Sequence, residues 1–455
     1  MKRWRCRICA YVHRGDEPPA KCPVCEVGPE FFERLPDEDL SVQAGEAPSA
    51  VVVIGNGVAG HHAALALRRT TRKSQIKVLT DEPHPFYSRM SLTPYVAGEI
   101  SRDDLSLFDE ARYAEQDIDL VLGQRVARID RRERVVVTDS GRELPYDRLV
   151  ITTGAAAGRP PIPGIDQPKV VVLRTLDDAE HLISLAPELS HVVVLGGGLL
   201  GLESAYALKA RAGCRVTVLE MAPRLLPRQL DSAAAALLET EVARKGIEVR
   251  TGIGVEGFGD SGGEGPVEVN LAGGAVVGGD LVVVAAGIRP NLGLAKAAGL
   301  ETNLGVMVDD GMRTSDRNIF AAGDVAEHRG ALYGIWPTAM SMGDVAGANA
   351  GGAALTLETQ IAATFLKVLG IPVFSAGRAA APPEGSRALC SHERENGLYR
   401  KLVIHEGRVV GGILLGTLEG STALSAAVES AHEVDLPSDL DQEKEQQLLM
   451  EILSR

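Results

Sequence analysis

Cysteine is concentrated at the start of the chain. Four of its six cysteines fall within the first 25 residues, as two pairs with two residues between the members. Such spacing lets a tight turn aim both thiolates at one centre, and two turns complete the tetrahedral S4 shell of a zinc or iron ion. Neither pair is followed by histidine, which excludes covalent haem attachment, and a thioredoxin-like disulfide would need only one pair. The spacing alone leaves iron and zinc open. The predicted metal ligands are Cys6, Cys9, Cys22 and Cys25.

A glycine-rich loop follows the first strongly apolar run. Ala50–Ile54 reads as a buried strand and leads directly into the loop. A second strand pattern, Ile76–Leu79, ends just before Asp81 and Glu82. The glycines permit a tight turn and let backbone N–H groups approach a pyrophosphate at the N-terminus of the next helix. Either acidic residue could accept the ribose hydroxyls. The predicted pyrophosphate contacts are Gly55, Gly57, Ala59 and Gly60.

The same unit is repeated about 140 residues later. The strand pattern His191–Leu195 precedes a second glycine-rich loop, and the following strand ends at Glu220. Two complete units predict two dinucleotides, a bound flavin and a nicotinamide donor. The Glu220 carboxylate would bond the 2′-hydroxyl of NAD and repel the 2′-phosphate of NADP, although Arg224 and Arg228 lie near enough to weaken this preference. NADH is therefore expected, with NADPH second. The predicted contacts are Gly196, Gly198, Leu199 and Leu200.

Length and composition describe the body that must hold these sites. The chain has 455 residues, more than one hydrophobic core accommodates, and 45% of them are hydrophobic. A formal net charge of −14 disfavours nucleic acid and anionic membrane surfaces as partners. No apolar run approaches the roughly 20 residues of a membrane span, and the first residues lack a signal-peptide core. We expect a soluble, cytoplasmic protein.

The cysteine segment resembles a known metal module. Trp4–His13, together with Gly15, Pro18 and Cys22–Cys25, is similar to the short rubredoxin-type module of rubrerythrins, in which four sulfurs hold one iron that cycles by a single electron. The chain departs from that pattern at Ala10 and Glu26, where glycine is usual. The acidic segment 36–49 that follows reads as a tether, which would let the module reach a cofactor on the main body.

From Val51 to about Gly416 the chain resembles the FAD-dependent pyridine-nucleotide oxidoreductases. The similarity is greatest to NADH:rubredoxin reductases and the flavin part of assimilatory nitrite reductases. The matching segments are Phe86–Leu92, Ile151–Ala155, Val284–Asn291, Thr314–Val325 and Trp336–Ala339. The resemblance implies FAD and a nicotinamide cofactor, and says less about the electron acceptor. The further cofactor contacts it implies are Arg89, Thr153, Gly154, Gly287, Gly323, Asp324 and Trp336.

Two of the implied positions are candidate catalytic residues. Glu203 corresponds to a position near the flavin and nicotinamide in relatives, the alternative being a carboxylate beside a helix N-terminus. Arg89 would pair with Glu203 or lie at the flavin N5 region, the alternative being a surface ion pair. Some relatives carry a lysine where this chain has Pro94, so their charge pair does not transfer intact.

Dithiol chemistry is excluded by the positions that lack cysteine. Disulfide reductases carry two cysteines on the helix after the first loop, where this chain has His61–Leu65 without one. Single-cysteine relatives place theirs near Tyr87, where Ser88 and Ser91 stand instead. The two remaining cysteines, Cys214 and Cys390, are expected to be buried packing residues.

Together these patterns predict an α/β protein with two Rossmann-like, three-layer ββα domains. The expected parts are a metal-bound rubredoxin-like β module (1–35), a linker (36–49), an FAD domain (50–160 and 289–352), an NAD(P)H domain (161–288) and a C-terminal α+β interface domain (353–455). The expected function is electron transfer from NADH through FAD to a fused Fe(Cys)4 centre, and on to a metalloprotein such as rubrerythrin or a flavodiiron protein. Two alternatives remain: a flavin reductase or oxidase whose module is a zinc ribbon, and an electron-transfer subunit of a larger complex. A homodimer is also open.

Overall fold

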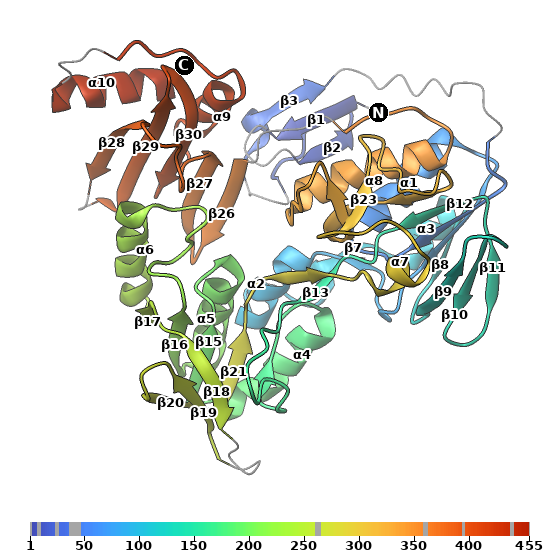
Figure 1. Ribbon diagram of the computed structural model, residues 1–455, viewed down its shortest axis with the longest axis horizontal. Coiled ribbons are helices and arrows are strands. Elements are labelled where there is room, and N and C mark those ends of the chain that lie inside the picture. The colour runs from blue at the N-terminus through green and yellow to red at the C-terminus, as the bar shows by residue number, and fades with distance from the viewer. Residues whose placement is uncertain are drawn as a thin grey trace.

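The N-terminal module is a three-stranded antiparallel sheet. The structure is a computed structural model that describes residues 2–6, 11–22, 27–35, 47–259, 265–357, 363–393, 396–436 and 441–454. Strands β1 (Lys2–Cys6), β2 (Val12–Gly15) and β3 (Phe32–Leu35) lie in the order β2-β1-β3 (Figure 1). Cys6, Cys22 and Phe32 form the buried centre of this module.

The first large domain has three layers, as the apolar runs predict. Its five-stranded parallel sheet has the order β24-β12-β4-β5-β8, a smaller antiparallel sheet shares its core, and two helices pack on each other against it. The parallel strands are β4 (Ala50–Ile54), β5 (Gln75–Leu79), β8 (Ile118–Val121), β12 (Arg148–Ile151) and β24 (Ile319–Ala321). The other elements are β9 (Val126–Asp130), β10 (Val135–Thr138), β11 (Glu143–Pro145), α1 (Val58–Thr70) and α8 (Trp336–Ala350).

The second large domain repeats this plan. Its parallel sheet has the order β14-β21-β15-β16-β17. Side chains alternate across the sheet: Val192 and Val194 pack among the helices, whereas Val193 packs with a small antiparallel sheet. The parallel strands are β14 (Val170–Val171), β15 (His191–Leu195), β16 (Arg215–Glu220), β17 (Glu248–Thr251) and β21 (Leu281–Val284). The helices are α4 (Leu176–Leu185), α5 (Leu199–Ala212) and α6 (Ser232–Arg244), and the small sheet contains β18 (Val255–Gly259), β19 (Val267–Leu271) and β20 (Val276–Gly279).

The chain crosses between the two domains twice, in adjacent strands. β13 (Ala155–Ala157) pairs antiparallel with β22 (Ile288–Pro290). Asn291 fastens the crossing, because its amide donates to the carbonyl of Thr153 at 2.7 Å and its N–H to that of Gly154 at 3.0 Å. Gly287 precedes the return strand. The matching segments Ile151–Ala155 and Val284–Asn291 thus lie at the two crossings.

The C-terminal domain is a five-stranded antiparallel sheet in the order β26-β27-β30-β29-β28. A hairpin joins β29 (Leu398–His405) to β30 (Arg408–Leu415) at Glu406 and Gly407. The final helix is α10 (Gln442–Leu453), whose N-cap residue is Asp441. The other elements are β26 (Ala363–Val368), β27 (Ile371–Gly377), β28 (Arg387–Glu393) and α9 (Ser421–Glu429). One apolar cluster unites this sheet with the second domain, since Val368, Tyr399 and Ile413 share it with Val194 and Leu208.

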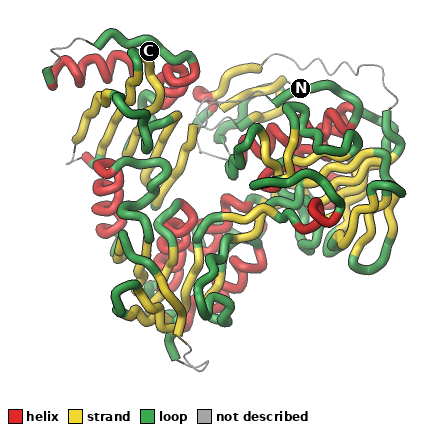
Figure 2. The backbone as a smooth tube through the Cα atoms, viewed as in Figure 1, coloured by secondary structure: helices red, strands yellow, loops and turns green. Residues whose placement is uncertain are grey.

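Short elements complete the fold, as the tube in Figure 2 shows. In the described part of the chain, no helix combines the length and apolarity that a membrane span requires. The short elements are β6 (Phe86–Tyr87), α2 (Leu92–Ala97), β7 (Ser106–Phe108), α3 (Glu110–Glu115), α7 (Gly293–Ala297), β23 (Val306–Val308), β25 (Ala326–His328) and the 3-10 turns η1 (Pro29–Phe31), η2 (Arg89–Ser91), η3 (Asp103–Leu105), η4 (Ala186–Glu188) and η5 (Gly323–Val325).

Candidate dinucleotide sites and metal module

The first glycine-rich loop joins β4 to α1 in a shape that leaves room for a phosphate. Gly55 has a φ of 106°, which a residue with a side chain rarely adopts. A Cβ on Gly60 would overlap the carbonyl oxygen of Gly55, whereas a Cβ on Gly57 would meet nothing within 4 Å. Gly57 is also the N-cap of α1 and offers no side chain to the helix N–H groups. The loop is therefore closely packed at Gly60, whereas open space lies beside Gly57 and the first helix N–H groups have no side-chain cap. This arrangement fits a bound pyrophosphate. Ala59 lies on the packed side, in contact with the η5 turn.

The second loop, between β15 and α5, repeats each of these features. Gly196 has a φ of 120°, and a Cβ on Gly201 would overlap the Gly196 carbonyl oxygen. Gly198 caps α5 without a side-chain hydrogen bond and faces open space. Of the two leucines that begin α5, Leu199 is half-buried and Leu200 is 40% exposed. The predicted pair of dinucleotide cradles is thus present in backbone geometry.

Acidic side chains stand at the strand ends beside both loops, but they are used differently. Glu220 accepts hydrogen bonds from the N–H groups of Gly197 and Ala222, both at 2.6 Å, so its carboxylate lies across the mouth of the second loop. At the first loop, Glu82 turns away: it accepts from the hydroxyl of Tyr87 at 2.6 Å and pairs with Arg89. Asp81 remains exposed at the strand end. Both ribose contacts stay predictions, and of the two carboxylates it is that of Glu82 which Arg89 and Tyr87 engage.

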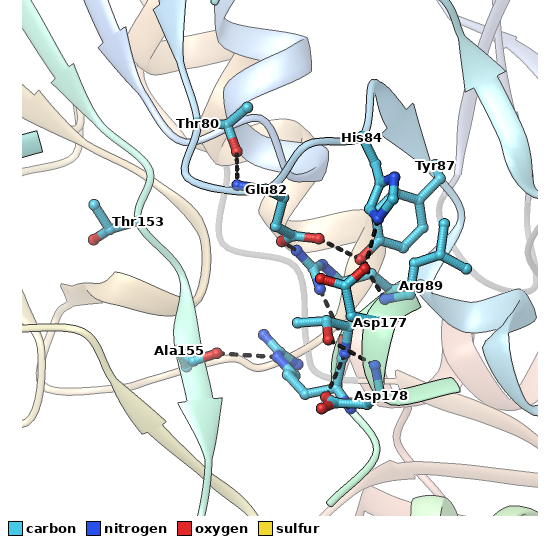
Figure 3. A network of polar contacts seen from close by, with 12 residues as sticks. Thr80, Glu82, His84, Tyr87, Arg89, Thr153, Ala155, Asp177 and Asp178 are labelled. Carbon is cyan, nitrogen blue, oxygen red and sulfur yellow. Dashed lines mark hydrogen bonds and ion pairs between the residues drawn. The ribbon is translucent and has the colours of Figure 1, made fainter. Parts of the chain in front are cut away.

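A polar network ties the 82–89 loop to the start of α4 (Figure 3). The Arg89 guanidinium donates to the carbonyl of Arg174 at 2.8 Å, and the Leu176 N–H donates to the Tyr87 hydroxyl at 3.1 Å. His84 Nε2 lies 2.7 Å from a carboxylate oxygen of Asp177. Burial raises the pKa of the Tyr87 hydroxyl well above its ordinary value, so this group stays protonated as a donor. The network fixes the position of the second domain against the loop beside the predicted flavin site.

Arg174 also links this network to the segment Thr314–Val325, which contains the predicted FAD contact Asp324. Its Nη2 lies 2.8 Å from Oδ2 of Asp324, and its Nε donates to the carbonyl of Ala155 at 3.0 Å. Asp324 belongs to η5, whose Gly323 packs against Ala59 at the start of α1. At the start of α8, Trp336 stacks with Phe86 at 6.0 Å between ring centres. Arg174 is not among the residues predicted from the sequence, although the capping box of Thr175 and Asp178 that follows it marks a fixed helix start.

Glu203 and Arg89 lie apart in the hydrogen-bond network. Glu203 Oε1 accepts the N–H of Leu369 in the C-terminal domain at 2.9 Å. Burial raises the pKa of the Glu203 carboxyl to about 7. Because Arg89 is held by Glu82 and the Arg174 carbonyl, the pairing of Arg89 with Glu203 that the sequence suggested as one option is wrong. The reason is that Leu369 arrives from a domain distant in the chain, which a local pattern does not register.

A buried polar chain beneath the first loop was not predicted. The Tyr113 hydroxyl donates to Asn56 Oδ1 at 2.7 Å and lies 2.7 Å from His61 Nδ1. His61 stacks on Phe86, with 4.2 Å between ring centres, and burial lowers its pKa well below the ordinary value. Asn56 is 8% exposed, and its Nδ2 is buried without a hydrogen-bond partner in the described structure. An orphaned donor in the loop fits a site that is completed by a polar ligand.

Two of the four predicted metal ligands are described, and their surroundings agree with a shared metal centre. Cys6 and Cys22 are each 1% exposed within one small cluster. Each cysteine N–H donates to the carbonyl five residues later, Cys6 to Tyr11 and Cys22 to Val27, both at 2.8 Å. The two described cysteines thus make the same backbone hydrogen bond, which agrees with two equivalent halves of one tetrahedral site. Cys9 and Cys25 lie outside the described residues.

The other two cysteines differ from each other. Cys214 is buried as expected, and burial raises the pKa of its thiol. Cys390 is exposed on β28, so the expectation that it is a buried packing residue is wrong. Its side chain points away from the core because it follows the buried Leu389, and neighbouring strand residues face opposite sides.

Comparison with protein-family models gives three matches. Residues 49–343 match pyridine nucleotide-disulphide oxidoreductase, residues 363–432 match the rubredoxin NAD+ reductase C-terminal domain, and residues 4–33 match the rubredoxin-like domain of rubrerythrin. The match at 4–33 includes all four predicted metal ligands.

Similar proteins and structures agree with these matches. A rubredoxin-NAD(+) reductase from Pseudomonas putida is 36% identical over 63% of this chain and 74% of its own length. A nitrite reductase [NAD(P)H] from Bacillus subtilis is 34% identical over 84% of this chain but 47% of its own, so the chain spans about half of that relative. The structure of NADH:rubredoxin oxidoreductase from Clostridium acetobutylicum superimposes with a TM-score of 0.73 and 26% identity, covering 86% of this chain and 98% of that one.

Proposed function

Because the chain belongs to the pyridine nucleotide-disulphide oxidoreductase family, we propose that it passes electrons from NADH through FAD to an iron centre in its own N-terminal module, and on to an electron-accepting metalloprotein. The observation that carries this proposal is the repeated cradle. Both glycine-rich loops begin with a glycine of positive φ, pack closely behind it and lead into a helix whose N-cap makes no side-chain hydrogen bond. Two dinucleotides and one metal module in a single chain supply a donor, a flavin and a one-electron acceptor.

The first cradle would hold FAD. The N–H groups at Gly57 would bind the pyrophosphate, Asp81 the adenosine ribose, and Asp324 the ribityl side, with Arg174 holding that carboxylate in place. When bound, FAD accepts a hydride and gives up electrons singly, as an Fe(Cys)4 centre requires. The flavin would be bordered at the start of α8 by Trp336, and at the two domain crossings by Thr153, Gly154 and Gly287. Arg89, fixed by Glu82, would keep a positive charge beside the flavin.

The second cradle would hold NADH. Gly198 offers its open side to the pyrophosphate, and Glu220 is already oriented by two N–H groups to accept the ribose hydroxyls. The exposed Leu200 gives the nicotinamide side an apolar surface that excludes water. Alignment of the donor with the acceptor is the main contribution that such a site makes. Glu203, the other catalytic candidate, would act at this end of α5.

A second candidate is an electron-transfer subunit of a larger assembly. It is favoured by the relative "Assimilatory nitrate reductase electron transfer subunit" from Bacillus subtilis, which is 33% identical over 80% of this chain and 47% of its own length. In that case the module would dock the chain to a catalytic partner. Native mass spectrometry of complexes purified from the source cell separates the two, because only the subunit function requires a stable partner.

The proposed function is tested by an anaerobic NADH titration followed by visible spectroscopy. We expect flavin bleaching together with loss of ferric–thiolate absorbance. Flavin bleaching without an iron signal in metal-replete protein would replace the iron centre by a zinc ribbon. The absence of flavin bleaching by NADH would overturn the first step. The Cys6→Ser, Cys22→Ser double variant is the control, because it should lose the iron signal and keep flavin reduction.

A further inference from the structure

One aromatic side chain connects the metal module to the body of the protein. Phe365, on β26, packs against the cluster of Cys6, Cys22 and Phe32 in the module, and also against the core of the C-terminal domain. Figure 1 places the module's sheet next to β26. Phe365 therefore packs against two apolar clusters, and the cluster in the module contains the two described metal ligands.

The strand that presents Phe365 is held along its whole length. β26 pairs with β27 from Ala363 to Val368, and the next N–H, that of Leu369, donates to Glu203 on α5. Leu366 points to the opposite side and packs in the apolar cluster of the second domain. A single strand thus carries the module contact on one face and contacts the helix of the second cradle at its end.

The module's size makes this contact important. Units below about 40 residues rarely bury enough apolar surface to fold alone, and they depend on metals or on neighbouring structure. Among its described residues the module buries the side chains of Cys6, Cys22 and Phe32. The partly buried residues around them are mostly aromatic: Trp4, Tyr11, Phe31 and Phe365 itself. Aromatic side chains bury large areas and dominate contacts between protein surfaces. Phe365 is the member of this group that comes from outside the module.

We propose that β26 is the docking strand of the N-terminal module and that Phe365 is its anchor, so that the module receives electrons in a fixed pose on its own chain. The segment 36–49 then connects two docked parts and does not serve as the tether of a diffusing carrier. The docking pose stands on the contacts of Phe365, whereas its use in electron transfer rests on the proposed function.

The pose is tested on the full-length, zinc-loaded chain by small-angle X-ray scattering. Phe365→Ala should broaden the distribution of interatomic distances, because the module leaves the body. Leu366→Ala is the matched control: it removes a similar apolar side chain from the opposite face of the same strand and should leave the distribution unchanged. Phe365→Leu should restore most of the compact form. An unchanged distribution in Phe365→Ala, with the fold intact by circular dichroism, would overturn the docking strand.

The use of the docked pose in electron transfer is tested by anaerobic stopped-flow reduction of the iron-loaded chain. In Phe365→Ala we expect flavin reduction by NADH at the wild-type rate and iron reduction slowed by about tenfold or more. Lengthening the 36–49 segment should slow the variant and leave the wild type unaffected. Equal iron reduction in wild type and Phe365→Ala would overturn the fixed-pose transfer. If wild-type iron stays oxidised although flavin is reduced, the proposed function fails, while the scattering result still decides the docking strand.

Discussion

Arg174 and Asp324 form an ion pair across the two nucleotide-binding domains, with 2.8 Å between Nη2 and Oδ2. The two residues are 150 positions apart and come from the start of α4 and the η5 turn. The pair fixes a carboxylate that the proposed function assigns to the flavin. Loss of the Arg174–Asp324 ion pair should therefore weaken flavin binding more than it destabilises the fold.

Arg174→Gln should weaken FAD binding by about tenfold, because a site that is organised before binding loses less freedom when the ligand arrives. The dissociation constant can be measured from flavin fluorescence on the deflavinated protein. Arg102→Gln is the control. It breaks an exposed ion pair between Arg102 and Glu180, a residue of α4, and should change FAD binding less than about twofold. Equal losses in both variants would contradict the assignment.

Glu220→Gln should shift cofactor preference towards NADPH. The amide still accepts one N–H of the second loop, but it no longer repels a 2′-phosphate. We expect the ratio of kcat/KM for NADPH to that for NADH to rise at least about tenfold, mainly through KM. Glu256→Gln, at an exposed position on β18, should leave the ratio unchanged. A ratio that stays the same in Glu220→Gln would remove Glu220 from the ribose site.

Glu203→Gln should stabilise the protein at alkaline pH. The folded state holds the pKa of this carboxyl at about 7, above its ordinary value, so the folded chain binds the proton more tightly than the unfolded chain. Stability from this group is present at acidic pH and is lost as pH rises towards 7 and above. Glutamine keeps the acceptor for the Leu369 N–H without the charge. Unfolding at about pH 8 should cost roughly 1–3 kcal/mol more in the variant, with little difference near pH 4. A constant difference across the range would contradict this.

His61 should make the fold sensitive to acid. Its lowered pKa means that the unfolded chain takes up a proton below about pH 6.5 while the folded chain stays neutral. Stability is thus present above that pH and falls by up to roughly 2 kcal/mol on going to pH 5. His61→Phe should reduce this fall in a thermal melt. Tyr113→Phe removes the hydrogen bond and keeps the imidazole, so it should retain the fall; if it behaves like His61→Phe, the hydrogen bond and not the imidazole is responsible.

Cys6→Ser should empty the metal module. Loss of one thiolate from a four-sulfur site leaves an incomplete shell, so bound metal should fall from about one ion per chain to a small fraction. Elemental analysis measures it directly. Cys390→Ser changes an exposed cysteine in the C-terminal domain and should keep the full metal content. Retention of metal in Cys6→Ser would argue for ligands other than the two pairs.

The elements that sequence patterns predicted are those whose signals are local. Each strand–loop–helix–strand unit spans only about 30 residues. A single stretch of sequence therefore contains the glycine-rich turn, the helix start and the acidic residue at the end of the second strand. The Glu406–Gly407 hairpin was predictable for the same reason. The contacts that decide between alternatives are not local. Glu82 rather than Asp81 turns to Arg89 because the 86–89 loop folds back, and Glu203 meets Leu369 only after the C-terminal sheet has docked.

The apolar cluster shared by the second domain and the C-terminal sheet has a consequence for cooperativity. Val194 and Leu208 cannot lose their surroundings without exposing Val368, Tyr399 and Ile413 as well. The two parts should therefore melt in one transition and protect their amides from hydrogen exchange to a similar depth. A cut at the domain boundary would divide this shared cluster and leave an open apolar face on each piece, so we expect the pair to behave as a single folding unit despite its two sheets.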